Sequence, residues 1–190
     1  MNVEMEVDKS QMAKLQAALA LTGKKKLNRE MAIAINKTAQ WTRKQTAKNI
    51  TRGLRLASAV VKKRISQTKR AKPTSLSGQV TVNGTGRLSL KWFAYQQTSK
   101  GVPYKIEKGG TRKVAVGAFR GPKPGVQSVK LKNAIWKRAG KNRYPLKRLH
   151  GVSIVPYYKE HKLDGVTKKE TAERLRYEVQ RRIGQALRGF

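Results

Sequence analysis

The sequence contains no cysteine, only two histidines and only 10 acidic residues in a chain of 190. Without cysteine there is no disulfide framework, thiolate zinc site or cysteine nucleophile. His150 and His161 stand apart in the sequence and have few carboxylates near them. We therefore expect no metal site.

Long hydrophobic runs are also missing. The longest apolar stretches fall far short of the roughly 20 residues that a membrane span requires. The chain begins with Glu4, Glu6 and Asp8, where a secretory signal would carry positive charge and then an apolar run. We expect a protein that is intracellular or assembled inside a cell, with no membrane contact.

The residue patterns of common catalytic sites do not occur. There is no Gly-x-Ser-x-Gly elbow and no Walker sequence, and Gly84-Thr85-Gly86 is better interpreted as a hairpin turn than as a nucleotide loop. The central region offers only Glu107 for carboxylate chemistry, which argues against a glycosidase or a metal-dependent nuclease. We expect no catalytic, cofactor-binding or metal-binding residues, and a chain that is not an enzyme.

Positive charge is the most prominent property of the sequence. Lysine and arginine number 44, which gives a formal net charge of +34, and no carboxylate occurs between Glu30 and Glu107 or between Glu107 and Glu160. Any one of these cations can be an ordinary solvated side chain, but the total predicts a negative neighbour, most often nucleic acid. Aromatic residues are only 6% of the chain, and no base-reading motif occurs, so we expect contact with phosphate rather than with bases. The candidate residues lie in or near predicted loops: Lys69, Arg70, Lys72, Arg112, Lys113, Arg120 and Lys123.

Hydrophobic periodicity predicts helices in the first third of the chain. Residues 2–7 alternate as an edge strand would, and apolar spacing then predicts a helix from Asp8 to Gly23. A longer helix is predicted from near Asn28 to Gly53, with a narrow stripe of small or apolar residues on one face. A third helix is predicted from about Leu56, with Val60, Val61 and Ile65 facing inward.

From Lys72-Pro73 onward the period changes from helical to extended. Short alternating pieces separated by glycines predict antiparallel strands near 80–82, 88–92, 102–106, 114–118 and 129–138. We expect these strands to form one meander, with Trp92 and Phe93 in its core.

The C-terminal part returns to helix, with a short piece near 155–163 and a long helix from about Thr167, where Thr167 and Glu170 have the spacing of a capping box. One face of this helix is apolar, which favours core or subunit interface over a membrane anchor. Its interface candidates are Leu175, Val179, Ile183 and Leu187. The predicted fold is α+β, a single domain over 1–190 with a mainly helical part (1–72), a β-sheet part (73–150) and a C-terminal helical part (151–190).

Several segments spread over most of the chain carry a family resemblance. They are residues 27–39, 61–65, 86–93, 101–102, 114–119, 135–138, 140–141, 145–146 and 149–153. Together they resemble the prophage minor tail protein Z family, the tail-completion proteins of lambda-like phages. The sequence departs from the family pattern at Trp136, which replaces another aromatic residue, and at Val152, which stands where proline is common.

This resemblance implies a structural virion protein in the tail or neck, assembled in the host cytoplasm. It implies a cyclic homo-oligomer, with a hexamer favoured, at the head-proximal end of the tail. Its partners would be other neck or tail proteins and the genomic DNA in the channel, bound without sequence preference. The charge leaves a second hypothesis open, a free-standing sequence-nonspecific nucleic-acid-binding protein of ribosomal or nucleoid type.

Overall fold

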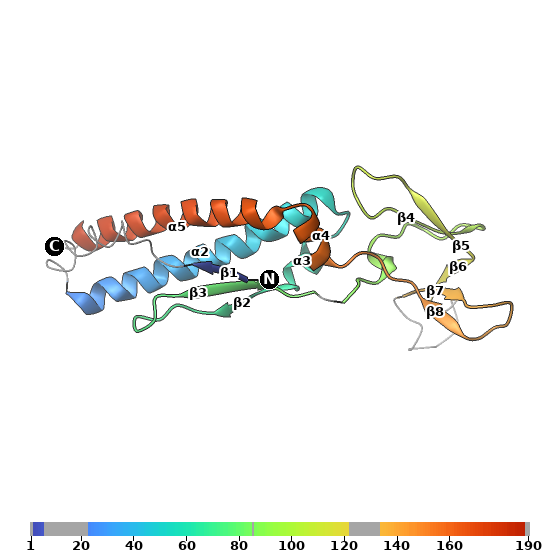
Figure 1. Cartoon of the computed structure of the whole chain (residues 1–190), viewed down its shortest axis with the longest axis horizontal. Coiled ribbons are helices and arrows are strands. Elements are labelled where there is room, and N and C mark those ends of the chain that lie inside the picture. Colours follow the sequence, from blue (N-terminus) through green and yellow to red (C-terminus); the bar gives the residue numbers. More distant parts are fainter. Residues whose placement is uncertain (1, 6–22, 85, 122–133, 189–190) are drawn as a thin grey trace. The chain divides into compact units, whose positions relative to one another are not determined.

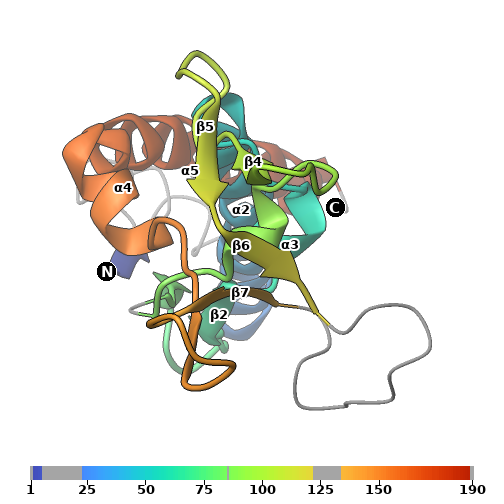
Figure 2. The same cartoon turned by 90° about the vertical axis from the view of Figure 1, so that its right-hand side faces the viewer.

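The computed structural model describes residues 2–5, 23–84, 86–121 and 134–188. Its helices and small antiparallel sheets confirm the α+β class. The chain divides into two compact units, whose helices and strands are labelled in Figures 1 and 2. Unit 1 comprises Met1–Asn49, Lys62–Asn83 and Lys159–Phe190, and unit 2 comprises Ile50–Val61 and Gly84–Tyr158. The single domain over 1–190 stays a prediction.

Two long helices dominate unit 1. They are α2 (Lys24–Gly53) and α5 (Leu163–Arg188), which lie side by side in Figure 1. The stripe predicted on α2 is confirmed, because Met31, Ile35 and Ala39 are buried along one face. Unit 1 also holds a three-stranded antiparallel sheet in the order β1-β3-β2, made of β1 (Asn2–Met5), β2 (Ile65–Lys69) and β3 (Gly78–Val82).

The seam between α2 and α5 is polar. Thr42 and Thr171 share a hydrogen bond of 3.0 Å between their Oγ1 atoms. Near one end, Asn49 Nδ2 donates to Glu170 Oε2 at 3.0 Å, and near the other Arg182 and Glu30 form an ion pair of 3.0 Å. These contacts show that the helices are antiparallel.

Two predictions for the helical parts need correction. The helix predicted from Leu56 through Ile65 is wrong, because α3 spans only Ser58–Lys62 and Ile65 begins β2. Ile65 pairs with Val82 and is buried, so strand pairing prevails over the helical spacing. The capping box is also wrong, because α5 starts at Leu163 and Thr167 lies buried within it. The strand predicted over residues 2–7 is confirmed over Asn2–Met5, where β1 pairs with β3. The helix predicted between Asp8 and Gly23 lies outside the described residues.

Unit 2 is built from short elements. These are the first residues of α3, the 3-10 turn η1 (Leu90–Trp92), β4 (Gly101–Tyr104), β5 (Lys113–Val116), β6 (Ala118–Arg120), β7 (Ile135–Arg138), β8 (Leu146–Arg148) and most of α4 (Ile154–Glu160). Strands β4 and β5 form a hairpin, and β6-β7-β8 form a second antiparallel sheet. Leu90, Val102, Ala118 and Ile135 make a shared core between these elements.

The single predicted meander is therefore wrong, because the described strands of the chain form three small sheets. Gly117, with φ of 70°, separates β5 from β6. Residues 88–92 do not form the predicted strand either. Leu88 N and Leu90 N still donate to the carbonyl oxygens of Val152 and Leu149, but the chain turns at η1. As a result Phe93 is buried as predicted, whereas Trp92 is 44% exposed.

Candidate nucleic-acid interface

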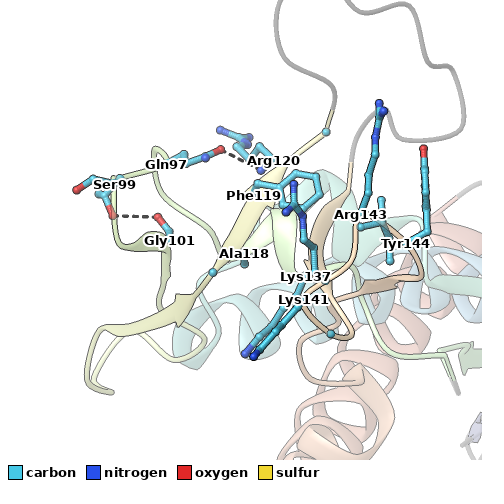
Figure 3. A pocket seen from close by; sticks show the side chains of 16 residues that line it. Gln97, Ser99, Gly101, Ala118, Phe119, Arg120, Lys137, Lys141, Arg143 and Tyr144 are labelled. Atoms are coloured by element: carbon cyan, nitrogen blue, oxygen red, sulfur yellow. Dashed lines mark hydrogen bonds between the residues drawn. The ribbon is translucent and has the colours of Figure 1, made fainter.

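A basic groove of about 830 Å³ opens on the surface of unit 2 (Figure 3). It runs between the segment before β4, strands β6 and β7, and the turn that joins β7 to β8. Among the described residues that line it, none is acidic. Its cations are Arg120, Lys137, Arg138, Lys141 and Arg143, and all five are exposed.

Strand pairing places these cations. Strand β6 pairs with β7 so that Arg120 lies opposite Ile135 and Ala118 opposite Lys137. Ala118 and Ile135 are buried in the core of unit 2, which fixes the position of both strands. The backbone amide of Arg120 donates to Gln97 Oε1 at 3.0 Å, which ties the rim of the groove to β6. The groove thus rests on a packed sheet rather than on a free loop.

The turn between β7 and β8 supplies two of the groove cations, Lys141 and Arg143. Ala139 N donates to Pro145 O at 3.0 Å and closes the turn that carries Lys141 and Arg143. In Figure 3 the side chains of Lys137 and Lys141 extend in one direction, and those of Arg143 and Tyr144 extend in the opposite direction. The cations of β7 and of this turn therefore extend in two opposite directions.

This positive charge is not balanced within unit 2. Lys137 lies directly opposite Lys147 in the β7–β8 pair. Like charges in that position destabilise a sheet by a few tenths of a kcal/mol. The sequence of unit 2 contains one carboxylate, Glu107, and the groove is not lined by it. A polyanion such as a nucleic-acid backbone would relieve this repulsion and would find charge-assisted donors on several elements.

Of the predicted phosphate-contact residues in unit 2, Arg120 lines the groove. Arg112 and Lys113 are exposed at the start of β5 and lie outside it. The Arg112 guanidinium stacks 4.2 Å from the centroid of the Tyr95 ring, where Arg55 also stacks at 3.7 Å. Lys123 lies outside the described residues.

The candidates in unit 1 are more dispersed. Arg70 lines a second basic hollow, of about 650 Å³, together with Arg43, Lys44 and Lys62. Lys69 and Lys72 are exposed on either side of Arg70 but do not line this hollow. The seven predicted residues thus do not form one site.

Four groove cations were missed by sequence reasoning. Lys137, Arg138, Lys141 and Arg143 follow one another closely around the turn residues Ala139 and Gly140. This density of cations in a turn was the available signal. Their approach to Arg120 was not visible, because it depends on the pairing of β6 with β7.

The interface candidates on α5 separate into two groups. Leu175 and Val179 are buried within the chain, so they belong to its core and are not available as a subunit interface. Ile183 is half-buried, and the side chain of Leu187 lies outside the described part of the chain. A subunit contact through this face stays a prediction.

Among the described residues, no group of three or more His, Asp or Glu side chains is arranged to hold a metal ion. None of the described helices has the length and apolar character of a membrane span.

The chain matches a known protein family. Residues 15–190 match the family described as prophage minor tail protein Z (GPZ), which covers nearly the whole chain and agrees with the motifs found in the sequence. Comparisons with curated proteins and with solved structures give no match. The chain therefore belongs to the prophage minor tail protein Z family and is a structural component of a bacteriophage tail.

Proposed function

We propose that this protein is a tail-completion subunit in the neck of the virion, at the head-proximal end of the tail. It forms a cyclic ring there, with a hexamer favoured, and helps to join tail to head. Its role is positional rather than catalytic. Family membership supports a place in the tail. The basic groove of unit 2 is the observation that favours the head-proximal end of the tail, where the DNA enters.

In this proposal the groove contacts the phosphate backbone of the DNA end that enters the tail. Duplex DNA carries about one negative charge per 1.7 Å of its axis, so a groove with several cations can contact consecutive phosphates. Exposed lysines on a rigid sheet suit such contacts, which position DNA without reading its sequence. The neighbouring tail and neck proteins are the other partners.

A ring would strengthen a weak contact. Each chain has a net charge of +34, and a cyclic arrangement repeats the same groove around one axis. Cations that face a narrow channel raise the local positive potential and hold a polyanion near the axis. An isolated subunit needs only modest affinity for DNA under this proposal, whereas a free-standing nucleic-acid-binding protein needs high affinity as a monomer.

The proposal is tested by the salt dependence of DNA binding. A Lys137→Gln and Lys141→Gln double variant removes two groove charges, and a Lys168→Gln and Lys169→Gln double variant removes two exposed charges from α5 in unit 1. Binding to a short duplex is measured by fluorescence anisotropy at several salt concentrations. We expect the groove variant to flatten the slope of log affinity against log salt by up to roughly 2, because each lost phosphate contact contributes about 0.9.

The matched α5 variant should leave that slope within a few tenths of the original value. Both variants carry the same net charge, so a difference between them reports position rather than total charge. If the two variants change the slope equally, the groove has no special part in DNA contact, and the proposal loses its main support.

A further inference from the structure

Strand β5 has one free edge in the described part of the chain. Strand β4 pairs with β5 so that Val102 lies opposite Ala115 and Pro103 opposite Val114. The other side of β4 is occupied, because Pro103 O accepts from Tyr95 N at 2.8 Å. Since backbone groups alternate in direction along a strand, Val102 directs its amide and carbonyl toward Ala115. The amides and carbonyls of Val114 and Val116 therefore point away from β4.

The side chains on this edge are also exposed. Val114 is 46% exposed and Val116 is 66% exposed, and strand alternation puts both side chains on the same face. Among the described residues, no hydrogen bond occupies their outward backbone groups. An exposed strand edge with apolar side chains is a template for the addition of another strand.

Charge indicates what kind of strand would fit. Lys113 belongs to β5 itself, Arg112 precedes it, and Lys100 stands beside the other end of the hairpin. All three side chains are exposed. A second copy of this chain would bring the same positive charges to the edge, which opposes self-pairing. A strand from an acidic protein would bring complementary charge.

We propose that the free edge of β5 binds an extended segment of an acidic partner protein by strand addition. The segment would alternate apolar residues, which pack on Val114 and Val116, with aspartate or glutamate, which pair with the exposed lysines beside the edge. Main-chain hydrogen bonds would supply affinity, and the charges would select the partner. This inference goes beyond DNA contact at the basic groove and does not depend on it.

The test uses the full-length protein and a short synthetic peptide. The peptide is about six residues long, the usual length of a strand, and alternates valine with glutamate. Two further versions carry N-methyl groups on every second amide. One version is methylated at the amides of the valines and the other at the amides of the glutamates. All three have the same charge, and in a strand only one set of amides can face β5. Binding is measured by fluorescence anisotropy at about 0.15 M salt, which screens exposed charges beyond roughly 8 Å.

We expect one methylated peptide to bind like the parent and the other to bind at least about tenfold more weakly, because it loses hydrogen bonds to β5. A matched pair of protein variants checks the site. Val116→Pro removes one outward amide and should weaken binding by about tenfold. Val116→Thr keeps the amide and the branched shape and should bind within about threefold of the original. Thermal melting confirms that both variants are folded.

Three outcomes would overturn the inference. Equal binding of both methylated peptides would mean that charge alone attracts them. Unchanged peptide binding by folded Val116→Pro would place the peptide elsewhere on the chain. If the protein self-associates through this edge, so that Val116→Pro dissociates it while the peptide does not compete, the occupant is a second copy and the acidic partner is wrong. DNA binding by Val116→Pro should be unchanged, which separates this test from that of the groove.

Discussion

Replacing Thr171 by valine should destabilise unit 1 more than replacing Thr42, although the two hydroxyls share one hydrogen bond. The hydroxyl oxygens lie 3.0 Å apart, and the residues are 2% and 0% exposed. Thr171 Oγ1 also donates its only hydrogen to Thr167 O, at 2.6 Å. It must therefore accept from Thr42. The two positions are chemically distinct, one a donor and the other an acceptor.

The expected free energies of unfolding follow from this assignment. Thr171→Val leaves the Thr42 hydroxyl buried without its acceptor, which costs about 1 to 3 kcal/mol. Thr42→Val leaves Thr171 still bonded to the Thr167 carbonyl, so only about 0.5 to 1.5 kcal/mol is lost. The double variant removes both polar groups at nearly constant shape. We expect it to cost less than Thr171→Val alone, which means a coupling energy larger than the cost of Thr42→Val, about 0.5 to 1.5 kcal/mol.

Equilibrium urea unfolding followed by circular dichroism measures these differences. Threonine and valine have similar helix propensities, so the backbone contribution nearly cancels. Thr74→Val, at an exposed turn position of unit 1, is the control and should lie within about 0.5 kcal/mol of the original. Additive effects of the two single variants, or a larger cost for Thr42→Val, would refute the assignment of donor and acceptor.

Two further variants test other parts of the structure. Glu178→Gln should lower the free energy of unfolding by about 1 to 3 kcal/mol, because this buried carboxylate holds two arginines of α5 at 2.5 and 2.9 Å. The same change at exposed Glu173 should have little effect in urea unfolding, and equal effects would contradict the role of the ion pairs. Gly101→Ala should lower the melting temperature, because the added carbon would lie 2.2 Å from a carbonyl oxygen of β5 and φ is 143°. Gly109→Ala, which meets nothing within 4 Å, is its control, and an equal melting temperature for both variants would refute the close approach.

The long helix α2 could be predicted from sequence because its signals are local. A stripe of small and apolar residues recurs at helical spacing, and Gly53 ends the helix as expected. The same reasoning failed at Ile65, where helical spacing continues but pairing with β3 turns the chain into a strand. Likewise Thr167 and Glu170 have the spacing of a cap, yet both lie within α5 and contact α2. In each case a tertiary contact decided the outcome.

In the candidate interface, too, local sequence signals could be predicted and tertiary contacts could not. The composition predicts phosphate contact, and one of the seven candidate residues, Arg120, lines the groove, but the cations that surround Arg120 were not predicted. Lys137 and Lys141 reach the groove because β7 pairs with β6 and a turn then folds back to β8. The free edge of β5 was also invisible, since it depends on which side of β4 is already occupied. Charge can be counted in a sequence, whereas its placement depends on strand register.

The most direct test of the proposed role is a cryo-electron microscopy map of the junction between head and tail in the assembled virion. We expect a closed ring of this protein at the head-proximal end of the tail, with Lys137 and Lys141 facing the channel and close to DNA density. A map that places the protein at the distal tip or on the outer surface of the tail, or that turns the basic groove away from the channel, would contradict the account.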